Sequence, residues 1–417
     1  MHAGKAGDET WEYGPVAHRS GLTALYSILA ALSAAYASDG GLTRGAAVRR
    51  ASQLASLGRA IFFDPSLSAA GKLSCASCHD PGHAYGPPNS ASVQSGGRDG
   101  RQPGIRATPS LRYLQVIPPF TEHSFDTEGP NPGIDNGATG GLTWDGRVDR
   151  VREQARIPLL SPFEMAGGSP AAIVSRIRKA RYADAVARLA RSAETGVWFA
   201  TVLEALETWQ QDPREFYPYS SKYDAWLAGA ATLNDRELRG LRLFSDPAKG
   251  DCARCHIATR SANGTPPQFT DYGFAALGVP RNRRIPANAD PGWFDLGLCG
   301  PERTDLRGRE EYCGQFMTPS LRNVATRQVF FHNGAVHSLR EAVEFYAQRD
   351  SHPEKWYPTG VDGVMKFDDL PERYWKNVEM GPPFGHRRGA APALNDQEID
   401  AIVAFLGTLT DGFQTVK

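Results

Sequence analysis

Two Cys-x-x-Cys-His motifs are the residues of this chain best suited to chemistry. The first runs from Cys75 to His79 and the second from Cys252 to His256. Two thiols three residues apart on a turn can bond to the vinyl groups of one haem, and the next imidazole can then reach the iron. The motifs predict two covalently bound c-type haems with His79 and His256 as proximal iron ligands. The predicted attachment residues are Cys75, Cys78, Cys252 and Cys255.

A single such motif could instead be half of a zinc site or a redox dithiol. Two copies, each followed by His in a chain with no other Cys-x-x-Cys pair, favour haem. The remaining cysteines, Cys299 and Cys313, most simply form a disulfide in an oxidising compartment, although the sequence leaves this pairing open.

The sixth ligand of each iron decides between electron transfer and reaction with peroxide. The chain has five methionines, and Met317, directly before Thr318-Pro319, is the natural thioether ligand for the second haem of a plain cytochrome. Because methionine side chains more often fill cores than bind metals, the spacing alone leaves this ligand open.

The N-terminal segment predicts export. An apolar run from Leu22 to Tyr36 is followed by small residues, which indicates a signal peptide over residues 1–37 that is cleaved after Ala37. The alternative is a membrane anchor, but the run is shorter than the roughly 20 apolar residues that span a bilayer. We therefore expect a periplasmic protein without stable membrane insertion after cleavage.

Composition excludes some classes of partner. The 46 Lys and Arg residues balance the 46 Asp and Glu residues, so nothing favours nucleic acid or an anionic membrane surface. The high content of glycine (43) and proline (30) is typical of long irregular connections.

The elements that must position the motifs are predicted to be helices. Residues 80–141 are rich in turn-forming residues and predict a long ordered loop. Helical spacing covers Ala46–Ile61, Val148–Ala155, Pro170–Ala193, Thr195–Gln211, Asp235–Phe244 after a capping Asn234, and Ile399–Leu406 after Asn395–Glu398.

An internal duplication organises these elements. The pattern Gly-x-x-x-Phe-x-Asp-Pro occurs at Gly58–Pro65 and again at Gly240–Pro247, each time just before a haem motif. We therefore expect an all-α fold with two cytochrome c-like domains and long irregular connecting loops. The domains would cover residues 38–220 and 221–417.

From Gly58 to Phe413 the chain resembles the bacterial dihaem cytochrome c peroxidase and MauG superfamily. Besides the two haem motifs, the segments that carry the resemblance are Phe62–Pro65, Thr108–Leu111, Trp144–Arg147, Pro162–Met165, Thr318–Asn323, Phe331–Gly334 and Leu339–Val343. They occur in the order found in the superfamily.

The resemblance implies a distal ligand for the second haem. In the superfamily this ligand lies 14 residues after the His of the Phe-His-x-Gly segment, and it is Met in the peroxidases and Tyr in the MauG branch. Here the position is Tyr346. A phenolate stabilises high iron oxidation states, whereas a thioether favours ferrous iron. From the residues alone, Tyr346 would more simply be a packed helix residue.

The resemblance also assigns residues around the first haem. Trp144 looks like the indole that carries charge between the irons, and Glu164 looks like the acid and base that moves protons on bound peroxide. Gln154 and Pro158 match residues that fill the same pocket in the MauG branch.

Several positions depart from the superfamily. The calcium between the domains uses an Asn where this chain has Ala107, and its backbone carbonyls fall on Arg327 and Val329, so calcium is not supported. The gating His of the peroxidases is replaced by Ser95, and His83 is out of register. We therefore expect a first haem that is open without reductive activation.

These residues together predict a MauG-type periplasmic enzyme. It would use hydrogen peroxide to form a high-valent dihaem state and oxidise Trp or Tyr of a partner protein. Some members complete a tryptophan-derived quinone, and MbnH-like members oxidise a Trp in a copper-binding partner. Gly250 stands where MauG has an electron-exit Trp, which weakens the quinone-forming role. The alternatives are a conventional peroxidase fed by a small cytochrome and a dihaem electron carrier.

Overall fold

The computed structural model describes residues 43–125 and 133–414, so the predicted signal peptide lies outside the described residues. Contacts divide the chain into residues 1–51 and residues 52–417, and the account below concerns the second unit. Within the described part, no helix is both long and apolar enough to cross a bilayer.

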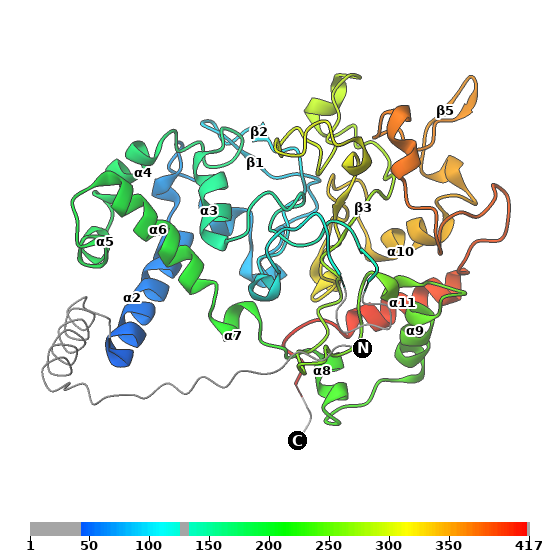
Figure 1. The fold of residues 1–417 in the computed structure, drawn as a ribbon, viewed down its shortest axis with the longest axis horizontal. Coiled ribbons are helices and arrows are strands. Elements are labelled where there is room, and N and C mark those ends of the chain that lie inside the picture. The colour runs from blue at the N-terminus through cyan, green and yellow to red at the C-terminus, as the bar shows by residue number, and fades with distance from the viewer. Residues whose placement is uncertain (1–42, 126–132, 415–417) are drawn as a thin grey trace, which may run out of the picture. The chain divides into compact units, whose positions relative to one another are not determined.

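Regular structure in the described residues is mostly helical (Figure 1). The helices are α2 (Arg44–Phe62), α3 (Val151–Leu160), α4 (Pro170–Ile177), α5 (Ala183–Ala190), α6 (Thr195–Trp209), α7 (Pro213–Phe216), α8 (Lys222–Leu227), α9 (Asp235–Ser245), α10 (Leu339–Gln348) and α11 (Asp396–Gly407). Three two-stranded antiparallel ladders pair β1 (Ser95–Gly96) with β2 (Gln102–Pro103), β3 (Phe274–Ala275) with β4 (Phe316–Met317), and β5 (Thr359–Gly360) with β6 (Gly363–Val364).

The predicted helices are present, with one correction. The single helix expected over 170–193 is two helices, because a turn at 178–182 separates α4 from α5. This turn brings Tyr182 into the buried cluster formed by α2, α3, α4, α5 and α6. There its hydroxyl donates to Asp64 at 2.7 Å. The capping boxes predicted at Asn234 and Asn395 both form.

The helices pack in two groups that repeat one arrangement. We refer to residues 52–219 as the first repeat and residues 220–414 as the second. In the first, a Cβ added to Gly58 of α2 would lie 2.0 Å from the Ala205 carbonyl oxygen of α6. In the second, a Cβ on Gly240 of α9 would lie 2.0 Å from the Ala401 oxygen of α11. Each glycine is therefore required for a close helix crossing, which explains why the Gly-x-x-x-Phe pattern occurs twice.

Two buried clusters correspond to these groups. One gathers α2, α3, α4, α5 and α6 around Phe62 and Trp209. The other gathers α9, α10 and α11 around Phe244 and Phe405. In Figure 1, α4–α6 lie together at one side of the view and α9–α11 at the other. The predicted domain boundary at residue 220 stays a prediction.

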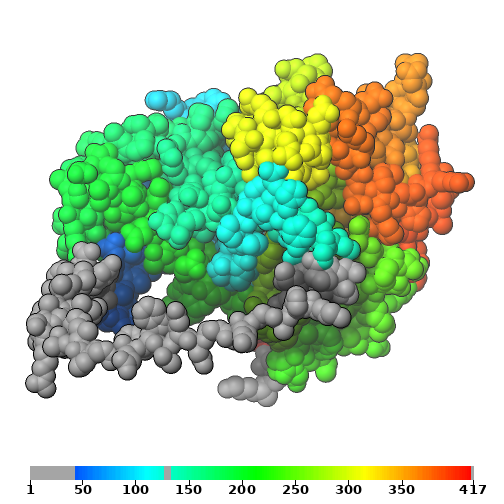
Figure 2. Space-filling model, viewed as in Figure 1, coloured from blue at the N-terminus to red at the C-terminus, as the bar shows by residue number. Residues whose placement is uncertain are grey.

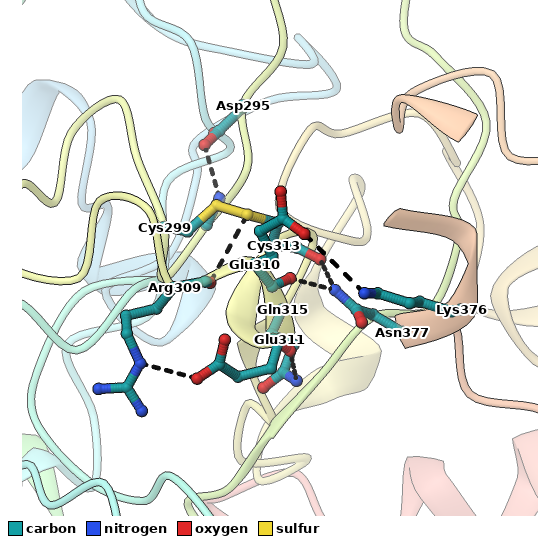
Figure 3. Close-up of a disulfide and its surroundings, with 10 residues drawn as sticks. Asp295, Cys299, Arg309, Glu310, Glu311, Cys313, Gln315, Lys376 and Asn377 are labelled. Atoms are coloured by element: carbon teal, nitrogen blue, oxygen red, sulfur yellow. Dashed lines mark hydrogen bonds and ion pairs between the residues drawn. A yellow bond between two sulfur atoms is a disulfide. The ribbon is translucent and has the colours of Figure 1, made fainter. Parts of the chain in front are cut away.

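A third cluster is built mainly from the second repeat, together with Ala138 of the first, and contains the remaining cysteines. Cys299 and Cys313 form a disulfide (Figure 3). The Asn377 amide donates to the carbonyl oxygens of Glu310 at 2.7 Å and Cys313 at 3.1 Å. The same cluster buries Phe345 of α10.

The long segment before α3 runs over the surface between the two repeats (Figure 2). Its Thr139 is bridged to Gly273 of the second repeat, and the Gly140 amide donates to the Tyr272 carbonyl at 2.9 Å. This segment ends in a tight hairpin, in which the Leu142 amide donates to Val148 at 2.6 Å. The hairpin presents Trp144 at its tip.

Candidate functional site

The two haem motifs form turns of the same geometry. Each begins with a short 3-10 turn, and the amides of His79 and His256 donate to the carbonyls of Cys75 and Cys252 at 2.9 and 2.8 Å. These bonds close one turn between the first cysteine and the histidine of each motif. Local hydrogen bonding therefore sets the arrangement that the motif spacing predicts.

The imidazoles are held in the tautomer that suits a metal. Nδ1 of His79 lies 3.0 Å from the Tyr85 carbonyl oxygen, and Nδ1 of His256 lies 2.9 Å from the Phe269 oxygen. Because a carbonyl only accepts, each Nδ1 carries the hydrogen and each Nε2 keeps its lone pair. Burial lowers the pKa of His79 to about 4 and also lowers that of His256, so both rings are neutral at pH 7.

One continuous cavity of about 470 Å³ contains both motifs. Its volume falls in the range of cofactor sites. Every residue predicted to act at the haems lines it. They are Cys75, Cys78, His79, Trp144, Gln154, Pro158, Glu164, Cys252, Cys255, His256 and Tyr346.

This donor set fits two c-type haems. The four thiols are unpaired with one another, and burial raises the pKa of Cys78 and Cys255 to about 11, so they are held as thiols beside apolar surface. A zinc site needs four ligands close together, and the described residues contain no such group of three or more His, Cys, Asp or Glu. The cavity and the donors therefore suit porphyrins better than zinc.

The repeats exchange hydrogen bonds where they meet. The Met317 amide of the second repeat donates to the Trp144 carbonyl at 2.9 Å. The Ala107 amide of the first donates to the His332 carbonyl at 2.7 Å. Trp144 Nε1 also donates to the Ala107 carbonyl at 2.8 Å, so the indole is fixed between the repeats.

A buried ion network anchors the Trp144 hairpin. Asp145 is fully buried, and Arg106 donates to it at 2.7 Å while also binding Asp295 of the second repeat. Although burial acts the other way, Arg106 and Arg147 lower the pKa of Asp145. The hairpin tip is thus locked by charge as well as by backbone hydrogen bonds.

The hairpin and the helix after it recur in the second repeat. The Phe330 amide donates to Val336 at 2.9 Å, as Leu142 does to Val148, and Gly146 and Gly334 share a φ of 61° and 60°. α3 and α10 then begin 188 residues apart, at Val151 and Leu339. The same offset relates Pro158 to Tyr346.

Equivalent positions therefore carry different groups in the two repeats. Tyr346 lines the cavity from α10, packs on Phe384 with ring centroids 5.3 Å apart, and is surrounded deeply enough for burial to raise its pKa. Pro158 lines the cavity from α3 and has no donor atom on its side chain. A phenol faces one haem motif and a hydrocarbon ring the other.

Glu164 and Gln154 add polar groups to the Pro158 side. Gln154 lies one helical turn before Pro158 and so shares its face. Glu164 lines the cavity and stays accessible to solvent, yet desolvation by the surrounding protein raises its pKa, against the opposing effects of Ser161 and Arg147. Such a carboxyl can exchange a proton near neutral conditions more readily than an ordinary one.

The structure shows the surroundings of three positions at which this chain departs from the superfamily, namely Ser95, His83 and Gly250. Ser95 belongs to β1, and the adjacent Gly97 amide donates to the Glu164 carbonyl at 2.7 Å, so this strand lies against the Glu164 loop. His83 is bound to Asp80 at 2.6 Å. At Gly250 an added Cβ would lie 2.7 Å from the Leu243 oxygen, which leaves no space for an indole.

The residues expected near calcium do not fit that ion. Calcium takes six to eight oxygen ligands. Position 107 offers only a methyl group, and the guanidinium of Arg327 already donates to the Val329 carbonyl at 3.2 Å.

Sequence reasoning missed Arg106, Asp295 and the role of Arg327. Arg106 and Asp295 are 189 residues apart, and no periodicity links them. The sequence offered a hint for Arg106 alone, because this residue lies two positions before the Thr108-Pro109 segment.

Comparisons with known proteins agree with these observations. A family model described as di-haem cytochrome c peroxidase matches residues 52–232. The chain is 32% identical over 378 residues to the methylamine utilization protein MauG of Paracoccus denitrificans, covering 86% of this chain and 88% of that protein. It is 27% identical over 293 residues to the cytochrome c551 peroxidase of Nitrosomonas europaea, covering 70% of this chain and 72% of that protein.

Among solved structures, the crystal structure of the diheme peroxidase BthA from Burkholderia thailandensis is similar, with a TM-score of 0.76 and 38% sequence identity. The match covers 86% of each chain.

Proposed function

Because this chain belongs to the di-haem cytochrome c peroxidase and MauG family, and is thus a haem-dependent oxidoreductase of the peroxidase type, we propose that it is a MauG-type enzyme. It would act on hydrogen peroxide in the periplasm and oxidise Trp or Tyr side chains of a partner protein. The family fold and its two haem groups are the basis of this proposal.

The observation that carries the proposal is the contrast between Tyr346 and Pro158. Equivalent positions of α10 and α3 present a phenol to one motif and no donor to the other. When bound, two c-type haems supply iron that reacts with peroxide and stores oxidising equivalents. A phenol ligand on one side and an open position on the other suit those two tasks.

We assign proton transfer on the open side to Glu164. Its carboxylate would accept a proton from one oxygen of hydrogen peroxide and return it to the other, which leaves as water. The two electrons that break the O–O bond would come from the haem when it is bound, which would also take up the remaining oxygen. Gln154 and Pro158 restrict the space beside it, so that a small oxidant fits and a second protein ligand does not.

Trp144 is assigned to charge transfer between the two sides. Trp144 lines the cavity shared by both motifs; its indole Nε1 donates to the Ala107 carbonyl, and its backbone carbonyl accepts from the Met317 amide. Asp145 and Arg106 keep the hairpin rigid, which holds the indole in one position.

A conventional peroxidase is the second candidate, because curated relatives of that activity match the chain over 70% of its length. That function needs an easily reduced second haem and a small cytochrome as electron donor. Met317 would be its thioether ligand, although its amide is bound to Trp144 in the interface between the repeats.

Low-temperature EPR and rapid mixing with peroxide test the proposal on the haem-loaded protein. We expect one high-spin and one low-spin ferric signal, and a reaction of the fully ferric protein with peroxide before any reductant is added. A reaction that starts only after one haem is reduced would favour the conventional peroxidase. Two low-spin signals would instead favour a dihaem electron carrier.

A further inference from the structure

A guanidinium group joins the two repeats beside the cavity. Arg327 follows the 3-10 turn Val324–Thr326 and lines the cavity wall. Its Nε donates to the Val329 carbonyl at 3.2 Å, and its Nη2 donates to the Thr108 carbonyl at 3.1 Å. Thr108 belongs to the first repeat and Val329 to the second, so one side chain bridges them through backbone oxygens.

The charge of Arg327 has no carboxylate partner among the described residues. Burial alone lowers the pKa of Arg327 to about 10, which still leaves the group protonated at neutral pH. Arg106 differs, because Asp295 and Asp145 outweigh burial and raise its pKa. Two backbone carbonyl oxygens accept from this partly buried cation, and carbonyl oxygens are also ligands that calcium takes.

The equivalent position of the first repeat carries no charge. The segment Thr108–Leu111 and the turn Leu114–Val116 correspond to Thr318–Leu321 and Val324–Thr326, with the same serine-to-carbonyl bonds at Ser110 and Ser320. By this correspondence the first-repeat counterpart of Arg327 is Ile117, which also lines the cavity. The cation is therefore specific to one side of the junction.

We propose that the Arg327 guanidinium is the resident cation of the junction between the repeats and holds the Thr108 and Val329 carbonyls in place of calcium. The haem-loaded protein then neither contains nor needs calcium. Ala107 is consistent with this role, because its methyl group cannot ligate a metal ion, whereas the guanidinium finds its two acceptors on the backbone. Arg327 is a positioning residue that also places a positive charge in the cavity wall.

Metal analysis and thermal denaturation of the haem-loaded protein give the first test. After equilibration with calcium and desalting, the protein should contain no stoichiometric calcium, and its melting temperature should be equal in EGTA and in millimolar calcium. Stoichiometric calcium, or a melting temperature that falls in EGTA, would overturn the proposal.

The double variant Ala107→Asn with Arg327→Thr gives the converse test. It supplies a side-chain oxygen and removes the guanidinium, so we expect it to bind calcium and to melt at a temperature that rises and saturates with calcium concentration. A folded double variant that ignores calcium would contradict the claim that the guanidinium occupies the place of a cation.

Arg327→Met, Arg327→Lys and a matched control separate charge from packing. Removing a positive charge from the cavity wall should shift the midpoint potential of the first haem to a lower value, and Arg327→Lys should restore it. Arg176 also donates to two carbonyls, Leu67 at 3.3 Å and Gly167 at 2.9 Å, but within one repeat. Arg176→Met should lower the melting temperature without shifting either potential. Unshifted potentials in Arg327→Met would overturn the electrostatic role.

Discussion

The two sides of the cavity are built on one backbone plan but differ in what they present to a haem. On the second side α10 presents Tyr346, and on the first side the matching position of α3 carries Pro158, with Glu164 close by. The histidines of the two motifs, in contrast, make the same bond from Nδ1 to a backbone carbonyl. The shared scaffold therefore fixes the two motif histidines, and the helices α3 and α10 are where the two sides differ.

The difference follows from the space around each residue. Gly58 and Gly240 are each held by a helix crossing that leaves no room for a Cβ. Tyr346 and Pro158 line a cavity, so helix crossings do not confine their side chains as they confine the two glycines. A change at the cavity can therefore alter the chemistry while both helix crossings stay intact.

The largest expected effect is the loss of one haem at a time, which separates the contributions of the two sides of the cavity. Cys75→Ala with Cys78→Ala should remove the first haem, and Cys252→Ala with Cys255→Ala should remove the second, because the thiols provide the covalent attachment. Mass spectrometry of protein made in a host with haem-attachment machinery should show two haems in the parent and one in each variant. One haem or none in the parent would contradict the central assignment.

Glu164→Gln should slow the reaction with peroxide by about 10²–10⁴-fold, the usual contribution of general acid and base catalysis. Desolvation raises the pKa of Glu164 above its ordinary 4.5, so on acidification the carboxylate is protonated earlier than usual. The acid limb of the rate profile should therefore lie above pH 4.5 and disappear in the variant. Rapid mixing over a pH series measures both. A variant with parental rates would assign the proton transfer elsewhere.

Tyr346→Phe and Tyr346→Met should change the low-spin ferric signal and the potential of the second haem while leaving the first able to react with peroxide. A thioether should raise the potential relative to the phenolate, because it favours ferrous iron. EPR and spectroelectrochemistry measure the change. If ligation is the same in parent and both variants, another residue, most simply Met317, is the ligand.

Trp144→Phe should keep both haems and the reaction with peroxide but delay oxidation of the second haem, since phenylalanine is harder to oxidise than indole. The variant also loses the Nε1 bond to the Ala107 carbonyl, a cost of about 1 kcal/mol. Phe199→Leu, a packing change in the first core away from the cavity, is a control for stability alone. Unchanged oxidation of the second haem in Trp144→Phe would show that the indole is not the relay.

The smallest expected effect concerns a feature of the second repeat alone. Cys299→Ser with Cys313→Ser opens a loop of 14 residues, which should cost about 3 kcal/mol of stability on the chain-entropy model. The melting temperature should fall while the haem content stays at two. Loss of the second haem would instead show that this loop positions α10.

The sequence by itself determined the parts set by local rules. The motif spacing predicted two haem attachments, capping residues located α9 and α11, and the repeated glycine pattern indicated the duplicated helix crossing. The sequence left the pairing of Cys299 with Cys313 open, and the structure contains that disulfide. Each of these depends on residues close in the chain or on a count of like residues.

Tertiary structure decided what depends on contacts between distant segments. The turn that splits residues 170–193 depends on Tyr182 reaching Asp64, 118 residues away. The bridge from Arg327 to Thr108 spans 219 residues, and no periodicity encodes it. The equivalence of Pro158 and Tyr346 became clear from the matching hairpins before α3 and α10, although the sequence carries a trace of it, since Gly146, Val148, Arg152 and Glu153 recur 188 residues later as Gly334, Val336, Arg340 and Glu341.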